Sequence, residues 1–83
     1  MGKRDIYDSL VEHIIQNQNQ FYRAAYSYVK NREAALDVVQ NAICKGLENY
    51  EKLQSPEAMA SWFYRIVINE SLMYLRKEKK YIA

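Results

Sequence analysis

The chain has 83 residues, of which 49% are hydrophobic and 27% are charged, and its net charge at neutral pH is only +2. A chain of this length forms one domain and buries about 60% of the surface that it exposes when unfolded, which leaves little room for a deep catalytic cleft. The single cysteine, Cys44, excludes an internal disulfide bond and fits a reducing cytoplasm. No apolar run approaches the roughly 20 residues that span a bilayer, so we expect no membrane insertion.

The first third of the chain carries apolar residues at spacings of three and four, interrupted only by the polar run QNQNQ at 16–20. This spacing predicts one long amphipathic helix over about residues 5–30. Asn31 supplies a stop for this helix or a cap for the next. The same spacing then continues through Ala35, Leu36, Val39, Ala42, Ile43 and Leu47. It predicts a second helix over about residues 32–49, with these side chains facing inward.

The helical spacing lapses in YEKLQSPEAMA at 50–60, the longest irregular stretch of the sequence. Within it, Ser55 followed by Pro56 supplies an N-cap residue and a first-turn proline for a third helix over about residues 56–80. Phe63, Ile66, Val67 and Tyr74 define the inward face of that helix. We therefore expect an all-α fold, a compact three-helix bundle with an irregular loop at about 50–56, in a single domain spanning residues 1–83.

Charge is unevenly distributed along the chain, because residues 31–58 sum to −2 and residues 59–83 sum to +3. This polarity indicates two different surfaces, one for a protein partner and one for phosphate. The second predicted helix presents a polar face made of Asp37, Gln40, Asn41 and Lys45. This face either points to water, as most polar helix faces do, or docks another protein through its amides and carboxylate.

The third predicted helix carries a stripe of aromatic, amide and cationic side chains. At about 100° of rotation per residue, one arc of roughly 60° holds Trp62, Arg65, Asn69, Arg76 and Lys80. An exposed ring stacks on a base, an amide bonds a base edge and cations hold the phosphate backbone, so the stripe suggests nucleic acid. Tyr50, Lys52 and Tyr64 add similar groups near the irregular connection. The competing interpretation is a core tryptophan beside a solvated charged edge.

Side chains that could carry catalysis or bind metal are few and scattered. His13 and Cys44 lie on different predicted helices, which does not provide a cluster of metal ligands. The sequence shows no nucleophile paired with a base and no glycine-rich phosphate loop. We therefore predict a protein that is not an enzyme and that has no catalytic residue, no metal site and no cofactor of its own.

Two long blocks of the sequence carry a more specific pattern. The first is FYRAAYSYVKNREAALDVVQNAICKGLENYEKL, with DVVQ at 37–40, and the second is SWFYRIVINESLMYLRKEKK, with WFYRI at 62–66, Asn69 and LRK at 75–77. Together these blocks resemble region 2 of a bacterial RNA polymerase sigma factor, of the extracytoplasmic-function group of the sigma-70 family. The resemblance covers the chain from about Tyr7 to Lys80. It implies a cytoplasmic protein of transcription initiation.

The resemblance also implies a role for each surface. The second helix would dock on the clamp helices of the beta-prime subunit of core RNA polymerase, through Asp37, Gln40, Asn41 and Lys45. The third helix and the loop before it would recognise and melt the minus-ten promoter element, with residues 50–60 forming a pocket for a base turned out of the non-template strand. Trp62, Arg65 and Asn69 would lie at the upstream edge of the bubble. The phosphate contacts would fall to Arg76, Lys77, Lys79 and Lys80.

The sequence leaves a second function open. Sigma factors of this group also carry a helix-turn-helix domain, for which 83 residues leave no room, so we expect an isolated domain or a fragment. An anti-sigma factor is a further expected partner. The alternative is a helical protein-interaction module that a regulator binds without direct contact to DNA. The salt response separates the two, because DNA binding weakens steeply with added salt and an apolar protein interface does not.

Overall fold

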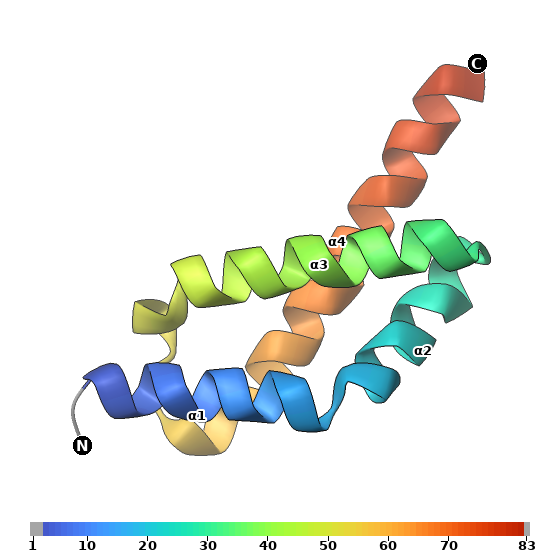
Figure 1. The fold of residues 1–83 in the computed structure, drawn as a ribbon. Helices are drawn as coiled ribbons and strands as arrows, with labels where there is room; N and C mark the ends of the chain where they lie inside the picture. Colours follow the sequence, from blue (N-terminus) through green and yellow to red (C-terminus); the bar gives the residue numbers. More distant parts are fainter. Residues whose placement is uncertain (1–2, 83) are drawn as a thin grey trace.

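Helices dominate the computed structural model, which describes the backbone of residues 3–82 and the side chains of residues 5–78. The α-helices are α1 (Lys3–Gln16), α2 (Gln18–Val29), α3 (Arg32–Glu48) and α4 (Met59–Ile82) (Figure 1). Two short 3₁₀ turns, η1 (Tyr50–Lys52) and η2 (Pro56–Ala58), lie in the connection between α3 and α4. The predicted all-α class is confirmed. The predicted three-helix bundle is wrong, because residues 5–30 form two helices instead of one.

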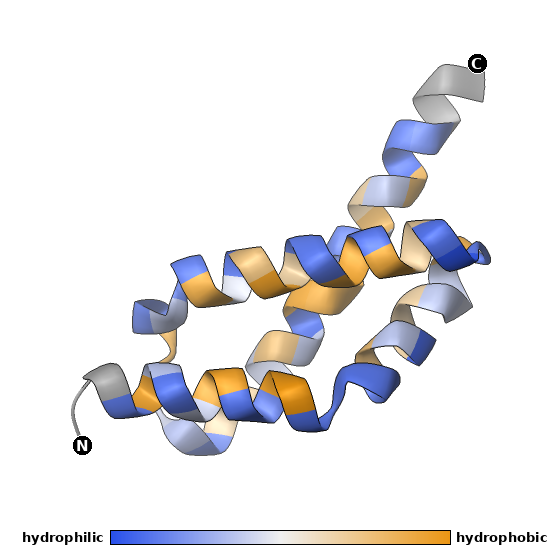
Figure 2. Cartoon of the chain, in the orientation of Figure 1, coloured by the Kyte–Doolittle hydropathy of each residue, from blue (hydrophilic) through white to orange (hydrophobic). Residues whose placement is uncertain are grey.

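The break between α1 and α2 lies at Asn17, within the polar run that appears as a hydrophilic corner in Figure 2. The Asn17 side-chain amide donates a hydrogen bond of 2.9 Å to the carbonyl of His13, so a side chain competes for a carbonyl at the end of α1. Residues 16–20 include no apolar side chain, so burial of a helix face does not favour one straight helix through this stretch. The corner instead lets Ile14 of α1 and Phe21 of α2 both reach the core.

The boundary between α2 and α3 follows local sequence signals. Lys30 adopts the left-handed conformation (φ 57°, ψ 25°), and its N–H donates to the carbonyl of Tyr26. The Asn31 side chain accepts a hydrogen bond of 2.9 Å from the N–H of Ala34, which makes Asn31 the N-cap of α3. Of the two roles open to Asn31, the structure therefore selects the cap. The predicted bounds of the second helix, 32–49, agree with α3 to within one residue.

The start of the last helix differs from the prediction. Ser55 has an extended backbone, and its carbonyl accepts a hydrogen bond of 3.1 Å from the N–H of Ala58. The Ser55 hydroxyl caps nothing, and the turn that follows it, with Pro56 at its start, is a 3₁₀ turn. The α-helical geometry begins only at Met59, three residues later than predicted. Proline at the first position of a helix still fits, because its missing N–H would have no partner there.

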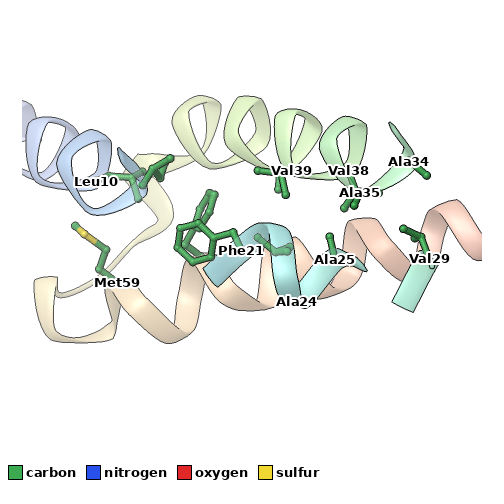
Figure 3. Close-up of a cluster of buried hydrophobic side chains, with 14 of the residues drawn as sticks. Leu10, Phe21, Ala24, Ala25, Val29, Ala34, Ala35, Val38, Val39 and Met59 are labelled. Carbon is green, nitrogen blue, oxygen red and sulfur yellow. The ribbon is translucent and has the colours of Figure 1, made fainter. Parts of the chain in front are cut away.

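The core lies where α4 crosses α2 and α3 (Figures 1 and 3). Phe21 of α2 and Phe63 of α4 pack edge to face, with ring centroids 4.8 Å apart. Buried alanines on α2 and α3 let the helix backbones approach around these rings. Phe63 and Val67 face inward as predicted, whereas Leu36, also predicted to face inward, is 53% exposed. Beyond the crossing, the C-terminal part of α4 projects from the other helices (Figure 1).

Candidate protein-docking and nucleic-acid surfaces

The predicted stripe on α4 lies on the outer side of that helix. Arg65, Asn69 and Arg76 are exposed, whereas Phe63 and Val67 on the opposite side are completely buried. Because residues at these spacings align along a helix, the guanidinium groups and the amide form one continuous surface. Lys77 is also exposed, on the C-terminal part of α4 that projects from the other helices (Figure 1). The side chains of Lys79 and Lys80 lie outside the described residues.

Trp62 stands at the N-terminal end of this stripe and is only partly buried. Its Cζ3 atom lies 4.0 Å from the position that a Cβ atom on Gly46 would occupy, so one edge of the indole packs over α3. Trp62 is therefore neither a fully buried core residue nor a fully exposed one. One edge of the ring contributes to packing, and the remaining surface is accessible beside Arg65 and Asn69.

The other aromatic candidates do not join the stripe. Tyr64 is 40% exposed, but it follows Trp62 by two residues and therefore lies on a different side of α4. It lines a separate hollow of about 290 Å³ with His13, Gln20 and Ser61. Tyr50 in η1 packs edge to face on Tyr7 of α1, with ring centroids 5.2 Å apart. Lys52, at the end of the same turn, is exposed. The structure thus distributes these three residues over different surroundings.

The polar face predicted for α3 is divided between two sides of the helix. Asp37, Gln40, Asn41 and Lys45 are all exposed, as a docking face requires. Gln40, however, lines a groove between α2 and α3, whereas the Lys45 ammonium lies 2.6 Å from a carboxylate oxygen of Glu70 on α4. These residues therefore do not form one flat surface.

The groove between α2 and α3 has a volume of about 510 Å³. Its apolar lining comes from Tyr22 of α2 and from Leu36, Val39 and Ile43 of α3. Its polar lining comes from Gln18, Asn19, Arg32 and Gln40. Sequence reasoning missed this groove because it counted Leu36 among the core residues. The spacing 36, 40, 43 was the available signal, since these positions lie together on a side of α3 that turns away from Ala35, Val38 and Ala42.

The other side of α3 is tied to α4. Glu70 is buried, with only 8% of its side chain exposed, and the half-exposed Lys45 is its ion-pair partner. The Lys45 ammonium also lies 3.8 Å from the sulfur of Met73. Lys45 is thus a structural link between the two helices as well as a docking candidate.

Tyr74 of α4 has a pKa above its ordinary value. Desolvation is the largest cause, and the hydrogen bond to Glu78 and the charges of Glu78 and Asp37 raise the pKa further.

Among residues 3–82, no helix is long and apolar enough to cross a membrane. In the same part of the chain, no group of three histidine, cysteine, aspartate or glutamate side chains is placed to hold a metal ion. The described surfaces offer apolar contact and amide hydrogen bonds in the groove, and ring, amide and guanidinium contacts along α4.

Comparisons with known proteins identify the family of the chain. The family described as Sigma-70 region 2 matches residues 13–81 of the chain. The RNA polymerase sigma factor SigV of Bacillus subtilis (strain 168) is 46% identical over 71 residues, which cover 86% of this chain and 43% of that protein. The chain thus spans less than half the length of this curated relative. No solved structure matches the chain significantly.

Proposed function

This chain belongs to the sigma-70 region 2 family, and from this premise we propose that it is the domain with which a sigma factor docks on core RNA polymerase and opens the minus-ten element of a promoter. The motifs of the chain place it in the extracytoplasmic-function group. The prediction that the chain is not an enzyme is confirmed by its family. Phosphodiester chemistry then belongs to the polymerase, and this domain supplies recognition.

The exposed stripe on α4 carries the DNA-binding half of the proposal. Arg65 and Arg76 stand on one side of the helix with Asn69 between them, and the accessible part of Trp62 lies at one end. Guanidinium groups bind phosphates, the amide bonds a base edge and an indole stacks on an unpaired base with about 1–3 kcal/mol. This combination suits a strand whose bases have left the duplex.

Melting then proceeds by capture of an unpaired base. Turning a base out of the duplex costs a few kcal/mol, and contacts that form only with the extruded base recover this cost. Residues 50–60 next to Trp62 are the proposed pocket, since they join α3 to the N-terminal end of the stripe. A base that fits poorly recovers less, so opening the duplex and reading its sequence become one event.

The groove between α2 and α3 carries the docking half of the proposal. Leu36 offers exposed apolar surface at its rim, and Gln40 beside it offers an amide that fixes orientation. We assign the clamp helices of the polymerase beta-prime subunit to this groove, because an amphipathic helix presents apolar anchors to such a site. Asp37 and Asn41 are exposed on α3 outside the groove lining and remain proposed as further contacts, whereas Lys45 is held by its ion pair with Glu70 of α4.

The docking half is tested by variants on α3 that leave the stripe intact. Leu36→Asp and Gln40→Ala should weaken binding of the chain to core RNA polymerase, because the first places a charge at an apolar contact and the second removes the orienting amide. Binding of a single-stranded minus-ten oligonucleotide should stay unchanged. Tyr28→Ala, an exposed position on α2 outside the groove lining, is the matched control. Normal core binding by both groove variants would refute the docking assignment.

The groove also favours the second candidate function, a module that a regulator such as an anti-sigma factor binds without contact to DNA. Its 510 Å³ volume and exposed Leu36 suit a protein partner whether or not α4 binds DNA. Arg65→Gln separates the two functions. It should weaken oligonucleotide binding if the stripe contacts DNA, and it should change nothing if the chain is only a docking module.

A further inference from the structure

The segment that joins α3 to α4 is anchored to the rest of the protein at three points. Leu53 is 4% exposed and Met59 is 7% exposed, and both belong to the buried cluster that includes Leu10 of α1 (Figure 3). The third anchor, Tyr50, is only partly buried. Between the anchors, Gln54 and residues 56–58 are exposed. The exposed residues are thus presented by a short segment whose shape depends on its anchors.

The Tyr50 anchor depends on α1. Its ring packs against Tyr7 with an interplanar angle of 80° and a centroid separation of 5.2 Å, which is a favourable edge-to-face arrangement. In addition, α1 makes close contact with η1 as a whole. At the end of η1, the N–H of Leu53 donates a hydrogen bond of 3.1 Å to the carbonyl of Tyr50. This bond links the position of the Tyr50 backbone to that of the buried Leu53. The pair therefore ties the start of the segment to a helix far away in the sequence.

We propose that Tyr7 is a positioning residue, which holds the segment 50–58 in the conformation that selects a base through its contact with Tyr50. The part of this inference that concerns base selection rests on the proposed function, because the segment can affect base selectivity only if it contacts a base. Tyr7 itself contacts no DNA in this account. It acts by ring packing, so a ring without the hydroxyl group should serve equally well.

The inference has a readout that does not depend on DNA, the hydrogen exchange of backbone amides. The amide of Lys52 donates a hydrogen bond of 2.9 Å to the carbonyl of Asn49, and the amide of Leu53 donates one of 3.1 Å to the carbonyl of Tyr50. Tyr7→Ala should speed their exchange by about three- to tenfold, the factor that loss of one aromatic pair implies. Tyr7→Phe should leave it unchanged. The amide of Val67, which lies inside α4 and belongs to a completely buried residue, reports any global loss of stability.

The second readout is base selectivity, measured as the ratio of affinities for a preferred oligonucleotide and for the same oligonucleotide with one base replaced. Tyr7→Ala should reduce this ratio by about three- to tenfold, and Tyr7→Phe should restore it. Ile15→Ala is the matched control, because Ile15 lies on the same helix and is 61% exposed. Tyr7→Leu keeps an apolar side chain at this position, so it replaces Tyr7→Ala if the alanine variant does not fold.

The outcomes of the two readouts are distinguishable. Unchanged exchange at Lys52 and Leu53 in Tyr7→Ala would overturn the positioning role. Faster exchange with an unchanged selectivity ratio would overturn the link between segment shape and base choice. If the unaltered chain showed no base preference, the proposed function would fail, and the exchange data alone would still decide whether Tyr7 positions the segment.

Discussion

Lys45 on α3 and Trp62 on α4 each combine a structural contact with a proposed binding role. The sequence suggests Lys45 as a docking residue because it lies on a polar helix face, yet its ammonium pairs with Glu70, whose side chain is only 8% exposed. For Trp62 the sequence leaves a stacking ring and a core residue both open, and one edge of the ring covers Gly46. In both cases the sequence shows the chemical group, and only the crossing of α3 and α4 shows what it contacts. A variant at either position therefore changes stability and binding together.

Lys45→Ala should lower the free energy of unfolding by about 1–3 kcal/mol, because it leaves the Glu70 carboxylate buried without its partner. Urea denaturation followed by circular dichroism measures this change. Adding Glu70→Gln to Lys45→Ala removes the unpaired charge and should restore most of the loss. Equal stability of Lys45→Ala and the unaltered chain would show that the ion pair contributes nothing to folding.

Trp62→Ala should weaken binding of a single-stranded minus-ten oligonucleotide by about 1–3 kcal/mol, the contribution of one stacked base. Fluorescence anisotropy of a labelled oligonucleotide measures it. Because the ring is partly buried, a smaller loss of stability should accompany the change, and Trp62→Phe should recover part of both. Collapse of the fold in Trp62→Ala, with no separate effect on binding, would favour the interpretation of Trp62 as a core residue alone.

The helices show which structural features a sequence pattern can predict. The spacing of apolar residues predicted α3 to within one residue and identified Phe63 and Val67 as core residues, since burial of one helix face is what creates that spacing. It missed the corner at Asn17, because the polar run is compatible with an exposed helix face as well as with a break. The spacing also placed Leu36 in the core. At this position, a small rotation about the α3 axis decides whether the side chain faces the core or the groove.

Gly46 makes the close crossing of α3 and α4 possible. A Cβ atom there would lie 2.8 Å from Cε1 and 2.9 Å from Cδ1 of Phe63, whose ring is completely buried, so the ring or the helix would have to shift. Gly46→Ala should therefore destabilise the protein by about 1–3 kcal/mol, although alanine favours a helix by about 1 kcal/mol over glycine.

The melting temperatures of Gly46→Ala and of Cys44→Ala provide the comparison. Cys44 lies two residues away on the same helix and is exposed, so its replacement should have little effect. A Gly46→Ala variant as stable as Cys44→Ala would show that the two helices do not approach as closely as described.

At the scale of the whole molecule, two surfaces of different chemistry lie on different elements. The groove between α2 and α3 combines apolar side chains with amides, and the outer side of α4 carries arginines without adjacent carboxylates in its stripe. The net charge of the chain is only +2. The placement of positive charge on α4, rather than the total charge, therefore favours DNA at this helix. Sequence reasoning found this polarity from the charge of residues 59–83. It missed the groove, because the spacing 36, 40, 43 shows one side of α3 but not that α2 lies beside it.

The salt dependence of binding should differ between these surfaces. For a single strand, the logarithm of the binding constant falls with the logarithm of salt by about 0.7 per phosphate contact. Arg76→Gln should therefore reduce the slope for oligonucleotide binding by about that amount. Leu36→Asp, a change in the groove on α3 and outside the stripe, should leave the slope unchanged. Equal slopes for the unaltered chain and Arg76→Gln would mean that Arg76 contacts no phosphate.

The most direct test of the central claim is binding of the whole chain to a fluorescent single-stranded oligonucleotide with minus-ten-like sequences, with and without core RNA polymerase from Bacillus subtilis. If one domain both docks and reads the promoter strand, binding should depend on the base sequence and should strengthen when core is present. Binding to core without any preference among oligonucleotides, or binding to neither, would contradict the account.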